Sequence, residues 1–206
     1  MLRIFFLIIA LKGSLMATEE PKYTVIGKYD KFEIRKYAPY IVAQTEVSGS
    51  FDEMGRKAFR ILFKYISGEN EKRNKIRMTA PVIQENSDRT GQKIQMTAPV
   101  IQEVDNANHQ RALFSFVMPE IFTLDTLPIP LDKRVKLKEI SSKTVAVLQY
   151  TGSWSEKKYN KKVAVLLEAL KCADIRIVGK PIFARYNSTF SLSFFRRNEI
   201  MIEIEK

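Results

Sequence analysis

Gly49-Ser50-Phe51-Asp52-Glu53 returns 103 residues later as Gly152-Ser153-Trp154-Ser155-Glu156. In both copies a strand-like run ends at a Gly-Ser turn, and a helical pattern begins directly after the turn. Serine and aspartate side chains accept hydrogen bonds from the free amides of a first helical turn. Ser50 or Asp52 is therefore the candidate N-cap in the first copy, and Ser153 or Ser155 in the second. The pair predicts two strand-turn-helix units, one in each half of the chain.

The match extends without a gap from 32–66 onto 135–169, and it places Val42-Ala43 on Val145-Ala146. Two copies of one unit in a chain of this length favour a single domain with pseudo-twofold symmetry. We expect the two repeats to span about residues 23–118 and 134–206.

A second repeat lies within the first half. Residues 75–85 return as 93–103 with ten of eleven positions identical, and each copy contains Met-Thr-Ala-Pro-Val. Ile, Met and Ala stand two apart in each copy, which predicts an extended segment with its proline at a sheet edge or bulge. Residues 86–91 are rich in turn formers, so the copies could form a hairpin-like unit. The repeat is either a simple duplication of a strand or part of a ligand site.

Helical spacing of apolar residues is confined to two segments, 52–66 and 156–171. Short segments with strand patterns are more numerous and lie at 23–28, 32–37, 40–47, 112–118, 135–140, 144–150, 175–178, 182–186 and 199–204. Few helices and many short strands predict an α+β fold, an antiparallel sheet or barrel with two packed helices.

The N-terminus carries an apolar run, residues 4–11, directly after Arg3. The run is too short to span a bilayer but suits the apolar part of a secretory signal peptide, and Ala17 offers a cleavage point. We expect residues 1–17 to be a signal peptide and 18–206 to be the domain, exported to the periplasm or secreted. If translation begins at Met16, the protein is cytoplasmic instead.

The chain is basic, with 34 lysines and arginines against 23 acidic residues and a net charge of +11. Such a surface attracts anionic partners, including phosphates, carboxylates and lipid head groups. The densest cluster, Lys157-Lys158 with Lys161-Lys162, suits a solvated helix face. No helix-turn-helix, zinc-finger or RNA-binding signature is present, so we expect no nucleic-acid partner. Weak association with anionic membranes stays open.

Catalytic residue types are scarce. His109 is the only histidine and lies in the polar run 105–110, and Cys172 is the only cysteine, expected to pack in the core. No Gly-x-Ser-x-Gly elbow, glycine-rich phosphate loop or spaced set of metal ligands appears. We therefore predict a monomeric binding protein with no catalytic residues and no metal site.

Apolar and aromatic residues are better represented, with thirteen phenylalanines and seven methionines. Residues 186–197 mix aromatic rings with small polar residues and end in Arg196-Arg197. This stretch is either an ordinary strand with one buried face or a loop whose rings cover a flat hydrophobic ligand. On the first predicted helix, the spacing of Arg56, Phe59, Phe63 and Lys64 places them within about one face and its margin.

Several of these segments together resemble the SOUL heme-binding protein family. The matching residues are Phe32-Glu33-Ile34-Arg35-x-Tyr37, the Met-Thr-Ala-Pro-Val motif and Arg196-Arg197-Asn198-Glu199-Ile200. The resemblance covers about residues 21–206. The doubled Met-Thr-Ala-Pro-Val motif is similar to the bacterial and plant members of the family.

The resemblance implies a distorted antiparallel β-barrel of two related halves flanked by two helices. It also implies that heme or another porphyrin binds in a shallow hydrophobic cleft between the first helix and the loop before the last strand. Members need not use an axial histidine, and here only His109 could serve. The implied function is a non-enzymatic carrier or buffer. The alternative is an effector-type or interaction module for another amphipathic anion, a peptide or an anionic membrane. The implied ligand-binding residues are Arg56, Phe59, Phe63, Lys64, Phe190, Leu192, Phe194 and Phe195.

Overall fold

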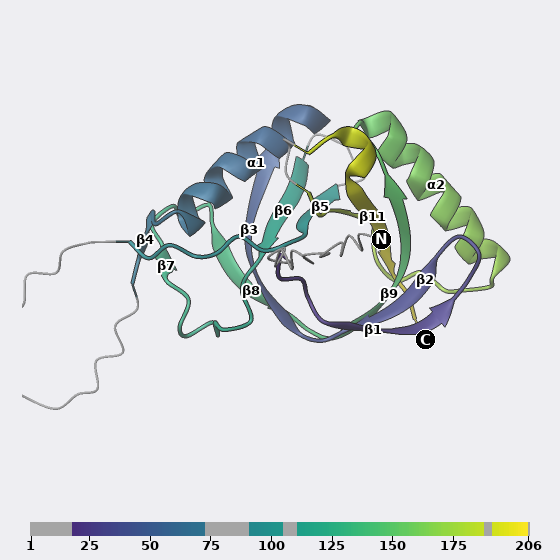
Figure 1. Ribbon diagram of the computed structural model, residues 1–206, viewed down its shortest axis with the longest axis horizontal. Helices are drawn as coiled ribbons and strands as arrows, with labels where there is room; N and C mark the ends of the chain where they lie inside the picture. The colour runs from purple at the N-terminus through teal and green to yellow at the C-terminus, as the bar shows by residue number, and fades with distance from the viewer. Residues whose placement is uncertain (1–17, 73–90, 105–110, 188–190, 206) are drawn as a thin grey trace, which may run out of the picture.

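The computed structural model describes residues 18–72, 91–104, 111–187 and 191–205 (Figure 1). The expected signal peptide, the first Met-Thr-Ala-Pro-Val copy, His109 and Phe190 lie outside these ranges. The predictions for them, including the hairpin-like pairing of the two motif copies, stay predictions.

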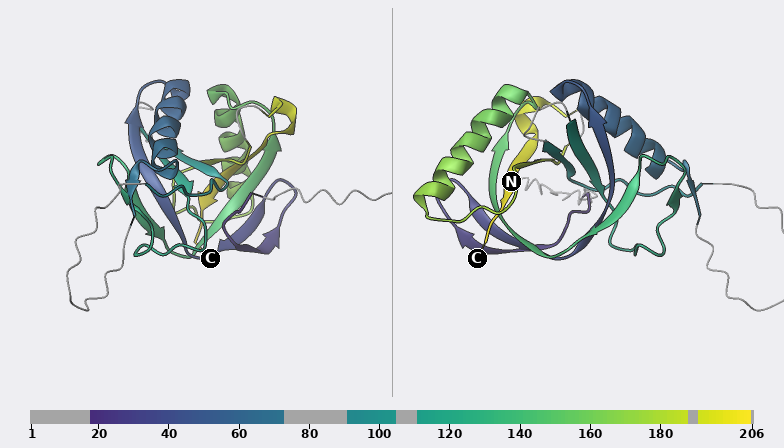
Figure 2. Two further views of the ribbon diagram at one scale, coloured as in Figure 1. Left: turned by 60° about the vertical axis from the view of Figure 1, so that its left-hand side comes forward. Right: turned by 180° about the vertical axis from the view of Figure 1, so that it is seen from behind.

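Nine strands form one curled antiparallel sheet, a half-barrel flanked by two helices (Figures 1 and 2). The predicted α+β fold is confirmed. The order across the sheet is β1 (Tyr23–Lys28), β2 (Glu33–Tyr37), β9 (Lys143–Thr151), β11 (Arg197–Glu203), β10 (Ile182–Arg185), β5 (Val100–Val104), β6 (Arg111–Val117), β3 (Tyr40–Ser48) and β8 (Lys136–Ile140). A separate small ladder pairs β4 (Asn70–Glu71) with β7 (Ile129–Pro130).

The offset of 103 residues relates the two halves strand by strand, because it carries β2 onto β8 and β3 onto β9 with identical bounds. Gly49 and Gly152 end the equivalent strands with φ of 136° and 124°, a region that side chains rarely adopt. The repeated glycine therefore marks the same backbone turn in both copies.

The halves exchange the equivalent strands β2 and β8. β2 pairs with β9 of the second half, and β8 pairs with β3 of the first half. The registers are equivalent, since Tyr37 lies opposite Lys143 and Ile140 lies opposite Tyr40. The two repeats thus interlock into one sheet.

Each helix begins at a serine of the repeated segment, although the two serines are not at equivalent positions. Helix α1 (Phe51–Ile66) has Ser50 as its N-cap, and the Glu53 side chain accepts a hydrogen bond from the Ser50 amide at 3.2 Å. Helix α2 (Glu156–Cys172) has Ser155, whose hydroxyl accepts a hydrogen bond from the Lys158 amide at 3.4 Å. Of the candidate N-caps, Ser50 and Ser155 are the ones used.

Each helix packs on equivalent strands, α1 on β3 and β6 and α2 on β9 and β11. Met54 and Leu62 of α1 are fully buried, as are Leu166 and Leu170 of α2. Among the described residues, no helix has the length and apolar character needed to cross a membrane.

Two local expectations were wrong, those for residues 175–178 and for Cys172. The strand expected at 175–178 is a single bridge from Ile177 to Ile204. Cys172 is exposed rather than packed, because two residues after the buried Leu170 a helix has turned by about 200°. In the second motif copy the strand begins at Val100, after the proline, which lacks the amide proton that a ladder needs.

Candidate functional site

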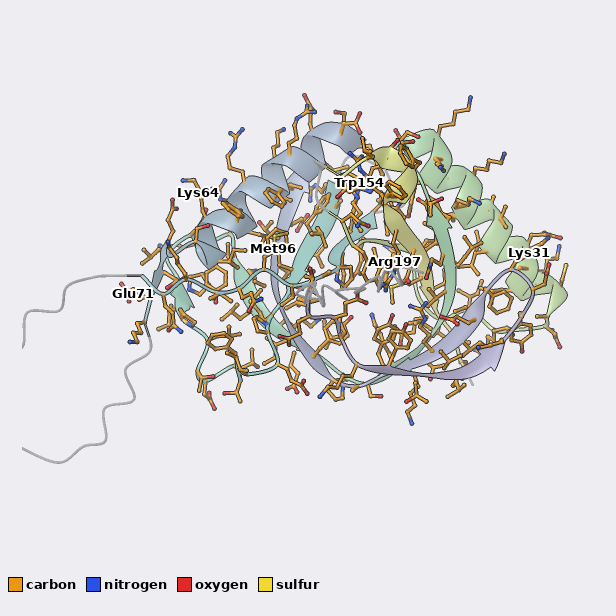
Figure 3. The ribbon with its side chains drawn as sticks, in the orientation of Figure 1. Lys31, Lys64, Glu71, Met96, Trp154 and Arg197 are labelled. Atoms are coloured by element: carbon orange, nitrogen blue, oxygen red, sulfur yellow. The ribbon has the colours of Figure 1, made fainter. Side chains whose placement is uncertain are left out.

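A cavity of about 810 Å³ lies between α1, the second Met-Thr-Ala-Pro-Val copy and the end of β10. Volumes of about 300–1,000 Å³ are usual for small-molecule sites. Figure 3 labels a residue from three of its walls: Lys64 on α1, Met96 in the motif copy, and Trp154 just before α2. The cavity therefore joins segments that are far apart in the sequence.

The α1 wall contains all four predicted helix residues, Arg56, Phe59, Phe63 and Lys64. The rings of Phe59 and Phe63 stack on each other, with centroids 5.5 Å apart and planes inclined by 13°. Phe59 also meets Phe116 of β6 edge-on at 5.5 Å. The two rings are therefore nearly parallel, and on α1 Arg56 precedes them and Lys64 follows them.

These rings are exposed because of their place on the helix. Ala58, Leu62 and Tyr65 face the sheet and are buried, whereas Phe59 and Phe63, one position further on, are 39% and 45% exposed. Large exposed phenylalanines are costly to leave in water, so this margin of α1 is a candidate binding surface.

The facing wall is formed by the second motif copy, through Met96, Thr97, Ala98 and Val100. The Thr97 hydroxyl donates to the Val117 carbonyl at 2.5 Å, and the Ala98 amide donates to the carbonyl of Glu19 at 2.9 Å. These bonds fix an extended segment that has no strand partner of its own at these positions. The second copy therefore contributes to a cavity as well as to a strand.

Sequence reasoning missed the third wall, which contains Trp154 and Arg185. The Trp154 indole nitrogen donates to Asn198 Oδ1 at 2.7 Å, and Asn198 Nδ2 donates to the Gly152 carbonyl at 3.0 Å. The asparagine of the Arg-Arg-Asn-Glu-Ile motif thus positions the tryptophan. A signal was present, since Trp154 is the repeat equivalent of Phe51, and both residues line the cavity.

The predicted loop residues lie elsewhere. Leu192, Phe194 and Phe195 are 60%, 61% and 69% exposed and are not part of the cavity wall. Residues Ser193–Phe195 form a short 3₁₀ turn, so the alternation in this stretch reflects a loop and not a strand. The loop adjoins the cavity through Arg196, whose Cζ lies 4.4 Å from the Trp154 ring. Ligand contact by these residues stays a prediction.

A buried carboxylate lies next to the cavity. Glu199 is completely buried and accepts hydrogen bonds from Arg35 at 2.9 Å, Tyr186 at 2.7 Å and Arg197 at 3.2 Å. Burial and the negative charge of Glu199 raise the pKa of Tyr186 above its usual value, which keeps the phenol protonated. Two arginines thus neutralise this carboxylate, and Tyr186 connects it to the cavity wall.

Few groups could coordinate iron here. Among the described residues, no cluster of three or more His, Cys, Asp or Glu side chains could hold a metal ion. The wall does contain Met96 and Tyr186, residue types that ligate heme iron in some proteins. The Tyr186 hydroxyl, however, donates to Glu199. The described wall is thus better suited to pack a flat ring and pair with acidic groups than to bind a metal.

Comparisons with known proteins identify relatives of the chain by sequence and by fold. The chain is 29% identical over 174 residues to heme-binding protein 2 of Homo sapiens, covering 83% of this chain and 77% of the relative. The C-terminal domain of EcmrR superposes with a TM-score of 0.60 at 10% identity, covering 89% of this chain and 98% of that domain. A protein described as a hydrolase from Listeria innocua superposes with a TM-score of 0.54 at 10% identity, covering 87% and 94%. At such identities the two structural matches show the fold alone.

The family comparison covers almost the whole described chain. The model of the SOUL heme-binding protein family matches residues 18–203. This range contains both helices, all the strands and every residue of the cavity wall. The chain belongs to the SOUL heme-binding protein family.

Proposed function

We propose that the protein binds heme or a related tetrapyrrole in the cavity beside α1, without catalysis, and acts as a carrier or buffer. Family membership and the relative named heme-binding protein 2 support the ligand class. The single observation that carries the location is the stacked pair Phe59 and Phe63 on the wall of an apolar cavity. Burying apolar surface contributes about 25 cal/mol per Å², so a macrocycle covering these rings gains most of its affinity there.

The charge of the cavity favours an anionic ligand. Four basic side chains line it, those of Arg56, Arg60, Lys64 and Arg185, against one acidic side chain, that of Asp52. Arg56 and Lys64 flank the phenylalanine pair along α1 and are placed to pair with propionate groups. Charge-assisted bonds of this kind add affinity and also fix the orientation of a ligand.

The alternative, a module for another amphipathic molecule, depends on the same cavity. A lipophilic cation is disfavoured, because the buried Glu199 already pairs with Arg35 and Arg197. An experiment could instead find that the cavity binds another amphipathic acid, a peptide or an anionic membrane surface. Export of residues 18–206, a monomeric state and the absence of a nucleic-acid partner are further parts of this proposal.

An absorbance titration of the protein, residues 18–206, with hemin tests the proposal. We expect a saturable change in the Soret band at one heme per chain. A linear change without saturation, equal to that given by an unrelated basic protein, would refute tetrapyrrole binding.

A further inference from the structure

Arg185 ends β10, and its guanidinium group forms part of the cavity wall. Four aromatic rings surround it, with centroid distances from Cζ of 4.6 Å for Phe183, 5.4 Å for Trp154, 5.7 Å for Phe51 and 5.9 Å for Phe114. Separations up to about 6 Å allow cation–π attraction. The rings hold the cation in place but bring it no negative charge.

The hydrogen bonds of Arg185 are incomplete. Nη2 donates to Oε1 of Gln102, a fully buried side chain on β5. Nε of Arg185 and Nε2 of Gln102 are both shielded from solvent, and neither has a partner among the described residues. The salt bridges in the described ranges join other arginines and two lysines, Lys22 and Lys64, to acidic partners, and none of them involves Arg185.

The cation is therefore poorly compensated. Desolvation lowers the pKa of Arg185 to about 10, and electrostatic interactions with Tyr150 and Asp52 oppose this only in part. The residue is half-buried, and the rings already shield much of its guanidinium group from water. An anion that reaches the group therefore adds an interaction at little further desolvation cost on the protein side. A carboxylate matches the planar fork of a guanidinium group with two parallel hydrogen bonds.

Helix α1 makes room for this group. A side chain at Gly55 would place its Cβ 3.2 Å from Nη1 of Arg185, closer than most such contacts. Glycine inside a helix is unfavourable relative to alanine, and φ at Gly55 does not require it. Its presence on the cavity wall is explained by the approach of the guanidinium group.

We propose that Arg185 is the receptor for a carboxylate of the ligand, so that the cavity takes an amphipathic acid with its acidic edge toward Gly55. This inference rests on the proposed function, because a tetrapyrrole with propionate side chains is an acid of this kind. Phe59 and Phe63 then cover its apolar face, one and two turns further along α1.

The length of α1 decides which rim cation can assist. Lys64 stands nine residues after Gly55, about 14 Å along the axis, whereas Arg56 is the next residue. Trp154, which adjoins Arg185, lies near the N-terminal end of α1, and Lys64 lies near the other end (Figure 3). An acid held by Arg185 is thus in reach of Arg56, and Lys64 contributes less.

The test compares iron-free protoporphyrin with its dimethyl ester, which has the same ring but no free acid. Wild type, Arg185→Met, Arg185→Lys and Lys64→Met are titrated with both, and Arg176→Met, an exposed arginine paired with Glu205, is the control. We expect Arg185→Met to weaken binding of the free acid about tenfold and that of the ester less than about twofold. Arg185→Lys should keep part of the preference for the free acid over the ester. Lys64→Met should lose less affinity for the free acid than Arg185→Met does.

Several results separate the two proposals. If wild type binds neither compound, the proposed function fails. If wild type binds both compounds and Arg185→Met changes the two affinities equally, the assignment of Arg185 is overturned. The same follows if Lys64→Met alone abolishes the preference for the acid. In both cases the proposal that the cavity binds a tetrapyrrole is unaffected. Thermal unfolding checks that each variant is folded. Should Arg185→Met not fold, Arg185→Lys, which keeps the charge but lacks the planar fork, must lower the acid-to-ester preference; an unchanged preference overturns the assignment.

Discussion

Phe51 and Trp154, equivalent residues 103 positions apart in the two halves of the molecule, face the same cavity. Both begin the segment that follows the repeated Gly-Ser turn, so the pseudo-twofold symmetry brings one aromatic residue from each half to the site. The Arg185 guanidinium lies within 5.7 Å of both ring centroids. The site is therefore a product of the duplication and not of either half alone.

Trp154 is the only tryptophan in the chain, which makes the cavity observable by fluorescence. Heme absorbs where tryptophan emits, so a macrocycle bound against this wall should quench the emission strongly and to saturation. The measurement is an emission titration with hemin, and free N-acetyltryptophanamide at the same absorbance corrects for light absorbed by hemin. A decrease no larger than that of the free amide would place the ligand away from Trp154.

Iron should contribute little to affinity, because the described cavity wall contains neither histidine nor cysteine. We expect hemin and iron-free protoporphyrin to bind with dissociation constants within about tenfold of each other. His109→Ala, which removes the only histidine, should leave the Soret band of the complex unchanged. A shifted band in this variant would instead identify His109 as an iron ligand.

The buried Tyr150 and the half-buried Tyr186 make an informative pair for stability. The Tyr150 hydroxyl is buried and has no hydrogen-bond partner among the described residues, whereas the Tyr186 hydroxyl donates to the buried Glu199 at 2.7 Å. Tyr150→Phe should leave the free energy of unfolding unchanged or raise it by about 1 kcal/mol, and Tyr186→Phe should lower it by about 2 kcal/mol. Urea denaturation measures both. Equal losses in the two variants would contradict this description of their hydroxyl groups.

Alkaline pH should destabilise the fold. Burial raises the pKa of Tyr37, Tyr150 and Tyr159 to about 12. The unfolded chain releases these protons near pH 10 while the folded chain keeps them, so the stabilisation is complete below about pH 10 and decreases between about pH 10 and 12. Each group should remove on the order of 1 kcal/mol per pH unit in that window. The pKa values of Tyr40 and Tyr186 are also raised by burial and act in the same direction, whereas the lowered pKa of Arg185 acts in the opposite one, as one group against five.

Denaturant unfolding at about pH 9 and pH 11, together with tyrosinate absorbance of the folded protein, checks this expectation. Tyrosine titration in the folded protein identical to that in denaturant would contradict it.

Much of the fold could be predicted because its signals are local. The Gly-Ser turn with its positive φ, the capping serines and the alternating strands each depend on neighbouring residues, and the 103-residue offset located β2, β3, β8 and β9 correctly. The exchange of β2 and β8 between the halves could not be predicted, since strand pairing is a long-range choice that alternation leaves open.

The candidate site, like the fold, could be predicted from the sequence only in part. Arg56, Phe59, Phe63 and Lys64 share one margin of a helix, which helical spacing alone indicates, and all four line the cavity. Arg185 ends a short buried strand, and nothing in its neighbourhood in the sequence shows that Gly55 and four aromatic rings will surround it. The loop residues near 192–195 were assigned from the family resemblance, and their exposure leaves that assignment open.

The central claim is that a tetrapyrrole lies on the phenylalanine pair of α1. Hemin titration of Phe59→Ala/Phe63→Ala tests it most directly, with Ile121→Ala/Leu131→Ala as the control, since Ile121 and Leu131 are 83% and 56% exposed and lie outside the cavity wall. Loss of two aromatic contacts should weaken binding about a hundredfold in the first variant and leave the second like wild type. An affinity for hemin that is equal in all three proteins would contradict the claim.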